Sequence, residues 1–191
     1  QRSILILSVL CHDLGKIRCT RFAEKRGKLR WISPGHDRES GSLSESFLTR
    51  IGTPLGIQEK VRKLVENHHY LNSFPDSTPS DASLRRLARR INPATTEELR
   101  QVMQADHRGR PPLIYETQEK RLAEFKTRIA ELKLKDSAPK ALLLGRHLIA
   151  YGRKPGPNFK PILDRAYEAQ LDGAFDDVGG ALDWVRSNRL L

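Results

Sequence analysis

The chain has 191 residues, of which 38% are hydrophobic, so it can bury one compact core and carry a smaller appended lobe. Its formal net charge of +11 favours polyanionic partners such as RNA, DNA or an anionic membrane surface, although a generically basic protein would carry the same charge. The sequence has no apolar run of the roughly 18 residues that a membrane span needs, no signal peptide, and only the cysteines Cys11 and Cys19. These features exclude a membrane protein and a disulfide framework, and they predict a cytoplasmic protein with reduced thiols.

The first segments of the chain predict a helix followed by a small hairpin. The continuous apolar run Ile4–Cys11 predicts a buried helix that ends at His12-Asp13. The stretch from Arg21 to Ile32 is the one β element that we expect, because Lys25-Arg26-Gly27-Lys28 can turn a hairpin there. Its apolar contacts would be Phe22, Leu29 and Trp31, with Trp31 acting as a packing residue.

Five later segments carry apolar residues at the spacing of an amphipathic helix. They run from Leu43 to Ile51, Ile57 to His68, Leu84 to Ile91, Leu99 to Asp106, and Leu122 to Leu132. Asp136–Pro139 predicts a boundary, and two short helical patterns follow it. We therefore predict an all-α fold: a helical domain over residues 1–135, including the small hairpin, and a helical tail over residues 136–191.

The strongest chemical signal is Cys11-His12-Asp13-Leu14-Gly15-Lys16. A lone His-Asp pair is weak, but this one ends a buried helix, where ionisable groups are costly unless they are paired or bound to metal. Gly15 is expected to allow a sharp change of direction after the pair.

Four further residues fit the same site. His36 stands at the expected start of the next helix. His68 and His69 continue the apolar stripes of Leu64 and Val65, so both are expected to point inward. Asp106 continues the apolar face of its helix. Singly, each histidine could be a core residue and the aspartate a helix cap; together, imidazole and carboxylate ligands indicate one or two ions of iron, manganese, nickel, cobalt or zinc. Such ions bind a phosphoryl oxygen and lower the pKa of a bound water.

The order of these residues resembles the HD superfamily of metal-dependent phosphohydrolases, whose pattern is an upstream His, the HD pair and a distant Asp. His12, Asp13 and Asp106 match the last three. The chain begins with Gln1 and its one methionine is Met103, so we expect a piece of a longer protein in which the first ligand lies upstream. Lys16 matches the phosphate-contacting lysine of the HDxGK pattern, although it could equally be a solvated surface charge.

Two-metal members of that superfamily, such as the HD-GYP phosphodiesterases, add a His and a later His-His pair. This resemblance implies that Asp13, His36, His68 and His69 hold one metal, and that His12, Asp13 and Asp106 contribute to the other. The HD-GYP signature itself is absent, so the resemblance does not imply a cyclic dinucleotide substrate.

A second resemblance is to bacterial tRNA nucleotidyltransferases (CCA-adding enzymes) and their poly(A) polymerase relatives. Asp106-His107-Arg108-Gly109-Arg110 is similar to the D-A-R-G-R that closes their HD domain. The tail segments Leu144–Ile149, Pro155-Gly156-Pro157, Pro161-Ile162-Leu163, Ala169–Gly173 and Ala181–Trp184 are also similar to theirs. His147 departs from the pattern, where an Asp is usual. The nucleotidyl-transfer head would lie upstream, so this chain alone is not expected to add CCA.

A basic stripe is expected on the helix that begins near Leu84. Arg85, Arg86, Arg89 and Arg90 fall on one side of it, opposite Leu84, Leu87, Ala88 and Ile91. Guanidinium groups suit phosphate contacts, so the stripe is a candidate RNA-binding surface. The alternative is a solvated charged face, and the net charge of +11 favours RNA.

Two functions remain after this reading of the sequence. The first is a metal-dependent phosphohydrolase that acts on phosphomonoesters or phosphodiesters of RNA ends or nucleotides, with Asp13 and Lys16 as the catalytic residues. The second is a non-enzymatic tRNA-binding body whose HD site only supports the fold. Partners would be tRNA or another RNA and a phosphorylated nucleotide substrate; the sequence does not indicate an oligomeric state.

Overall fold

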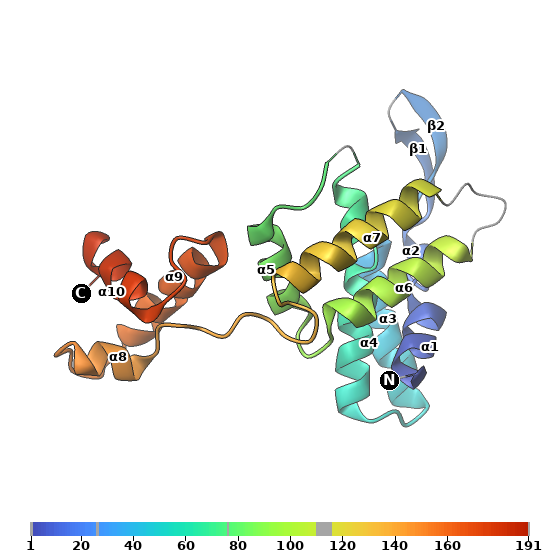
Figure 1. The fold of residues 1–191 in the computed structure, drawn as a ribbon. Coiled ribbons are helices and arrows are strands. Elements are labelled where there is room, and N and C mark those ends of the chain that lie inside the picture. The colour runs from blue at the N-terminus through green and yellow to red at the C-terminus, as the bar shows by residue number, and fades with distance from the viewer. Residues whose placement is uncertain (1, 26, 76, 110–115, 191) are drawn as a thin grey trace.

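Helices make up most of the protein, and one hairpin is appended to them (Figure 1). The computed structural model describes residues 2–25, 27–75, 77–109 and 116–190. The first part contains α1 (Arg2–Cys11), α2 (Lys16–Cys19), β1 (Arg21–Lys25), β2 (Lys28–Ile32), α3 (His36–Arg50), α4 (Leu55–Asn67) and the 3-10 helix η1 (Tyr70–Ser73). It is followed by α5 (Asp81–Ile91), α6 (Thr96–Arg108), α7 (Glu116–Glu131), α8 (Gly145–Ala150), α9 (Phe159–Asp172) and α10 (Val178–Ser187). The predicted all-α class with one hairpin is confirmed; Arg26 of the predicted turn and Arg110 of the closing motif lie outside the described residues.

The helical stripes read from the sequence form the core. The largest cluster joins η1, α5, α6 and α7 and includes Leu87, Met103 and Phe125. A second cluster joins α1, α3 and α4 around Cys11, Leu48 and Val65. Each large apolar side chain buried in this way contributes about 1.5–3 kcal/mol to folding. Together the two clusters hold α1, α3, α4 and α6 in a fixed arrangement.

Local signals fix where the key helices begin. Thr95 and Glu98 form a capping box at the start of α6, with each side chain accepting a hydrogen bond from the other residue's backbone NH. Ser80 caps α5 by accepting a hydrogen bond from the backbone NH of Ser83. Among the described helices, none has the length and apolar character needed to cross a membrane.

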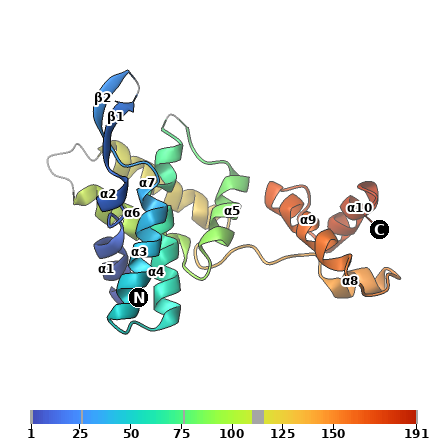
Figure 2. The same ribbon diagram turned by 180° about the vertical axis from the view of Figure 1, so that it is seen from behind.

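The hairpin differs from the prediction in its packing. β1 and β2 pair antiparallel and project from the body as a two-stranded arm (Figures 1 and 2). Phe22 and Trp31 contact each other, with ring centroids 5.4 Å apart, but Trp31 remains 70% exposed. The prediction that Trp31 packs was wrong, because an isolated two-stranded arm has no element over its apolar face.

The C-terminal helices α8, α9 and α10 have their own apolar cluster, which includes Leu148, Ala166 and Val185. They follow an extended segment after α7, and α9 lies beside α5 in both views (Figures 1 and 2). This arrangement suits the predicted tail, while the exact boundary at Asp136–Pro139 stays a prediction.

Charged side chains join α5 to α9. Arg86 donates hydrogen bonds to Glu168 and Asp172, and Arg89 also binds Glu168. Arg85 donates to the carbonyl oxygen of Leu171 at 3.2 Å. Arg90 donates to Asn67 Oδ1 at 2.7 Å, so all four stripe arginines have partners within the chain.

Candidate metal centre

Four separate elements bring the six predicted ligands together. His12 and Asp13 follow the last residue of α1, and His36 begins α3. His68 and His69 follow the last residue of α4, and Asp106 lies in the last turn of α6. Helix α4 ends at Asn67, so His68 and His69 lie in the turn that follows the helix and not on its apolar face. His68 is nevertheless only 3% exposed, as the stripe predicted.

The first group of candidate ligands is His12, Asp13 and Asp106, whose ligand atoms lie within 4.8 Å of one another. His12 Nε2 is 3.1 Å from Asp106 Oδ1 and 3.3 Å from Asp13 Oδ2. Atoms that each lie about 2.1 Å from one ion are about 3.0–3.5 Å from one another. These separations therefore suit a shared ion.

The second group is His36, His68 and His69, again with ligand atoms within 4.8 Å. The rings of His36 and His69 have centroids 4.8 Å apart, and those of His12 and His68 are 5.2 Å apart. Asp13 lies between the groups: its Oδ1 is 3.3 Å from His36 Nε2, whereas its Oδ2 faces His12. The six predicted residues therefore lie together in one site, and their role as metal ligands stays a prediction.

Backbone carbonyls fix the tautomers of three histidines. Nδ1 of His12, His36 and His68 lies 2.6–2.7 Å from the carbonyl oxygen three residues earlier, on Val9, Ser33 and Val65. A carbonyl oxygen only accepts, so each Nδ1 carries a proton and donates. In the neutral ring Nε2 then has the lone pair and is the atom available to a metal.

Several buried hydrogen-bond acceptors of this site have no donor, and this observation is the one that best fits a bound cation. Among the described residues, Asp13 Oδ1, His36 Nε2 and His68 Nε2 are buried and have no hydrogen-bond partner. Two of these acceptors, Asp13 Oδ1 and His36 Nε2, face each other across 3.3 Å. Burying unsatisfied acceptors costs about 1–3 kcal/mol each. A divalent transition metal would satisfy them, and nitrogen and oxygen ligands suit such an ion.

The ionisable groups of the site are strongly perturbed. Hydrogen bonds to Asp106 and Asp13 raise the pKa of His12 to about 10. Burial would raise the pKa of Asp13, but hydrogen bonds from His12 and Lys16 outweigh it and hold that pKa well below its usual range. Burial lowers the pKa of His68. At neutral pH the metal-free site therefore holds a proton on His12, an ionised Asp13 and a neutral His68.

We expect a bound metal to displace the proton from His12. Apparent metal affinity should then rise about tenfold per pH unit from pH 7 upward and level off near pH 10, the pKa of His12. The stability of the metal-free protein depends on pH in the opposite direction. The contribution of His12 to that stability is complete below its ordinary pKa of 6.5 and is lost as pH rises through about 10. Titration calorimetry in buffers of different ionisation enthalpy measures the protons released, and a value near zero at pH 7 would contradict this assignment.

Lys16 lies beside the centre without belonging to either ligand group. Its Nζ is 2.6 Å from Asp13 Oδ2, and its side chain is 40% exposed. It can therefore hold the carboxylate in place and still reach toward a substrate.

The role predicted for Gly15 was wrong. Its φ of −66° and ψ of −18° are ordinary for any residue, so no sharp turn requires glycine here. The requirement comes from α3, because a Cβ on Gly15 would collide with the carbonyl oxygen of His36 and lie 2.6 Å from the backbone nitrogen of Ser40. The Gly15 backbone NH also donates to Ser40 Oγ at 2.8 Å. No sequence pattern pointed to Ser40, since its role depends on the close approach of two segments.

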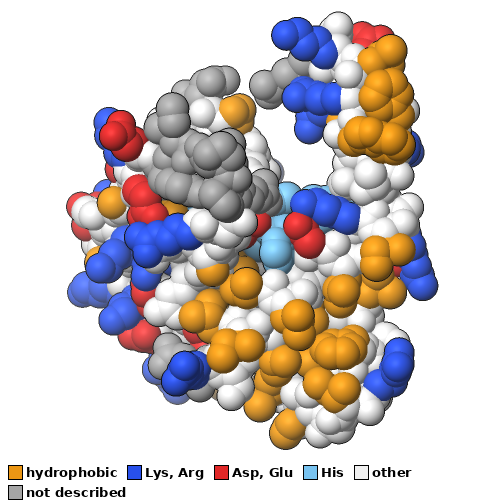
Figure 3. Space-filling view, turned by 90° about the vertical axis from the view of Figure 1, so that its right-hand side faces the viewer, with side chains coloured by type: hydrophobic (Ala, Val, Ile, Leu, Met, Phe, Trp, Pro, Cys, Tyr) orange, Lys and Arg blue, Asp and Glu red, His pale blue; other side chains and the backbone are white. Residues whose placement is uncertain are grey.

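A cavity of about 590 Å³ opens onto the second ligand group. His36, His69 and Lys16 line this cavity, together with Lys25 and Arg30 from the hairpin. The histidines lie at the bottom of a hollow that the hairpin overhangs (Figure 3). The hairpin cations were not predicted as site residues, although the alternation of basic residues along both strands was a usable signal.

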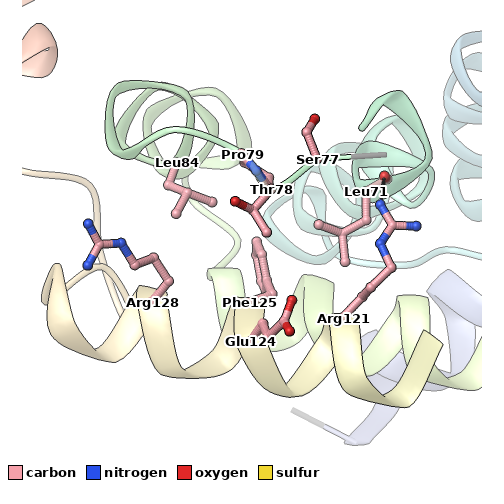
Figure 4. A pocket seen from close by; sticks show the side chains of 9 residues that line it. All are labelled: Leu71, Ser77, Thr78, Pro79, Leu84, Arg121, Glu124, Phe125 and Arg128. Atoms are coloured by element: carbon pink, nitrogen blue, oxygen red, sulfur yellow. Dashed lines mark hydrogen bonds between the residues drawn. The ribbon is translucent and has the colours of Figure 1, made fainter. Parts of the chain in front are cut away.

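A smaller cavity of about 170 Å³ lies between the η1–α5 loop and α7 (Figure 4). Leu71, Leu84 and Phe125 form its apolar wall. Arg121 donates to the carbonyl oxygens of Leu71 and Phe74, and Arg128 is paired with Asp81. Because these arginines already have partners, this cavity offers less chemistry than the histidine site.

Comparison with known proteins identifies the first part of the chain. A protein-family model described as HD domain matches residues 1–109, which is more than half of the chain. Searches of curated proteins and of solved structures gave no significant match. The matched region contains all six candidate ligands.

Proposed function

Because the chain belongs to the HD domain family of metal-dependent phosphohydrolases, we propose that its six clustered residues hold one or two divalent transition metal ions and that it hydrolyses phosphomonoesters or phosphodiesters of RNA ends or nucleotides. The observation that supports this most is the position of Asp13 between two ligand groups, with its buried Oδ1 facing His36 Nε2. The preset tautomers add to it, since they orient Nε2 of three histidines before any ion binds.

In the proposed reaction, water adds to phosphorus, the bond from phosphorus to the leaving oxygen breaks, and the proton lost by water ends on that oxygen. A metal in this site supplies a Lewis acid and a water of lowered pKa. Asp13 acts through both carboxylate oxygens, one toward each ligand group. Lys16 keeps Asp13 oriented and, because its side chain is partly exposed, can neutralise charge on the phosphoryl oxygens.

We expect phosphatase or phosphodiesterase activity that depends strictly on added metal. The protein is stripped with a chelator and reloaded separately with Mn²⁺, Fe²⁺, Co²⁺, Ni²⁺ or Zn²⁺, and hydrolysis is measured on p-nitrophenyl phosphate, its bis ester, mononucleotides and RNA with a terminal phosphate. At least one metal should restore hydrolysis that chelation removes. Absence of turnover with every metal would favour the scaffold function instead.

The resemblance of some motifs to those of tRNA nucleotidyltransferases is our ground for proposing a second candidate, a tRNA-binding body. It rests on the tail motifs and on the net charge of +11. The stripe on α5 is engaged with α9, but surface ion pairs of this kind contribute only about 0–1 kcal/mol each, so RNA phosphates could compete for the arginines. RNA binding by the stripe stays a prediction.

For this second candidate, replacing Arg85, Arg86, Arg89 and Arg90 with Gln is expected to weaken binding to every tRNA alike. The slope of log affinity against log salt should fall by about 0.7–0.9 for each lost phosphate contact. Binding is measured at several salt concentrations, with circular dichroism as the check on folding. Unchanged affinity, together with faster proteolysis of the segment between α7 and α8, would show that the stripe serves only to hold α9.

A further inference from the structure

The hairpin formed by β1 and β2 has two chemically opposite faces. Cross-strand partners share a face, and Phe22 pairs with Trp31 while Glu24 pairs with Leu29. The opposite face carries the pairs Lys25–Lys28, Ala23–Arg30 and Arg21–Ile32. We call Arg21, Lys25, Lys28 and Arg30 the cationic face; it carries no carboxylate.

The cationic face adjoins the histidine site. Lys25 and Arg30 line the cavity of about 590 Å³ that His36 and His69 also line. Basic side chains of the hairpin lie toward the hollow, and apolar side chains cover its outer edge (Figure 3). A ligand that reaches the histidines through this cavity therefore lies beside these cations.

These cations differ from Arg86 and Arg89 of α5 in having no acidic partner. Within the described part of the chain, Lys25, Lys28 and Arg30 form no ion pair, and Arg30 makes one long hydrogen bond, to the carbonyl oxygen of Lys25 at 3.4 Å. Clustered like charges on an exposed arm repel one another, so they favour an anionic ligand. Asp37 is the only carboxylate among the residues that line the cavity.

We infer that the cationic face binds the sugar-phosphate backbone of a single-stranded polynucleotide and leads its terminal phosphate to the histidines. This inference rests on the proposed function for the position of the reacting phosphate. Residues on one strand face repeat about every 6.6 Å, so the face extends about 13 Å from Ile32 to Lys28, further than the three linked phosphates of a nucleoside triphosphate. The cationic face itself carries no aromatic side chain, so its contacts are to phosphates and do not depend on sequence; Trp31, on the opposite strand face, borders the cavity.

The test measures binding of a labelled single-stranded RNA to the full chain at several salt concentrations. The variant Lys25→Gln/Lys28→Gln/Arg30→Gln should bind less tightly, and its log-log salt slope should be smaller by about 2, or about 0.7 per lost contact. The charge-conserving variant Lys25→Arg/Lys28→Arg/Arg30→Lys should keep the wild-type slope. Arg50→Gln/Lys126→Gln/Lys160→Gln removes the same charge from exposed positions outside the cavity lining and should keep most of the affinity.

Two results would overturn the inference. One is wild-type affinity and slope in the hairpin triple variant. The other is that the wild type binds ATP as tightly as the RNA and that the triple variant loses affinity for both to the same extent. That result would identify a nucleotide as the ligand. Binding is measured without turnover, so the two proposals can fail separately. If the protein hydrolyses no substrate but binds RNA through the hairpin, this inference is supported and the proposed function is not.

Discussion

Replacing Asp13 with alanine is expected to abolish metal binding and phosphohydrolase activity while leaving the helices intact. Asp13 faces His36 through Oδ1 and His12 through Oδ2, so its loss removes negative charge from both ligand groups. A metal Lewis acid is worth several kcal/mol in the transition state, so the rate should fall by at least about 1000-fold. Elemental analysis and steady-state turnover measure the effect, with circular dichroism to follow the fold.

Asp37→Ala is the matched control for metal content. It removes a neighbouring carboxylate that belongs to neither ligand group and accepts a hydrogen bond from the Arg38 backbone NH. This variant should bind metal as the wild type does. An Asp13→Ala protein with wild-type metal content and turnover would refute the central role given to Asp13.

Gly15→Ala is expected to destabilise the protein and to disturb the site although it adds a single methyl group. The new Cβ would meet backbone atoms of His36 and Ser40, which cannot move without shifting the start of α3. Overpacking of this kind costs about 1–3 kcal/mol, and each kcal/mol lowers the Tm by about 2–4 °C in a chain of this size. Because His36 moves with α3, metal affinity should fall as well.

Gly56→Ala provides the comparison, since a Cβ at Gly56 meets nothing within 4 Å on the helix α4. That variant should be as stable as the wild type or more stable by up to about 1 kcal/mol. Thermal unfolding and metal titration of both variants test the difference. Equal Tm values for Gly15→Ala and the wild type would show that the turn at Gly15 and α3 are less closely packed than the structure indicates.

Much of the fold and the set of candidate ligands followed from local pattern. The stripe of Leu84, Leu87 and Ile91 identifies a helix and its buried face, because a repeat of about 3.6 residues places those side chains on one side. An apolar run that ends in His12-Asp13 similarly identifies a buried pair that needs partners. The apolar helix faces and the HD, H, HH, D order, with its resemblance to HD-superfamily proteins, were enough to name the six residues that lie together.

The tertiary structure decided what those side chains meet. Whether arginines on α5 face RNA or α9 depends on Glu168 and Asp172, which lie about 80 residues further along the chain. The need for glycine at position 15 depends on the approach of α3, and the direction of the hairpin's cationic face depends on where the arm leaves the body. Sequence by itself determined the helices, their buried faces and the types of ligand, because these arise from neighbours within a few residues. The pairing of charges, the close approach of backbones and the shape of the cavity come from contacts between distant segments, and only the folded chain contains such contacts.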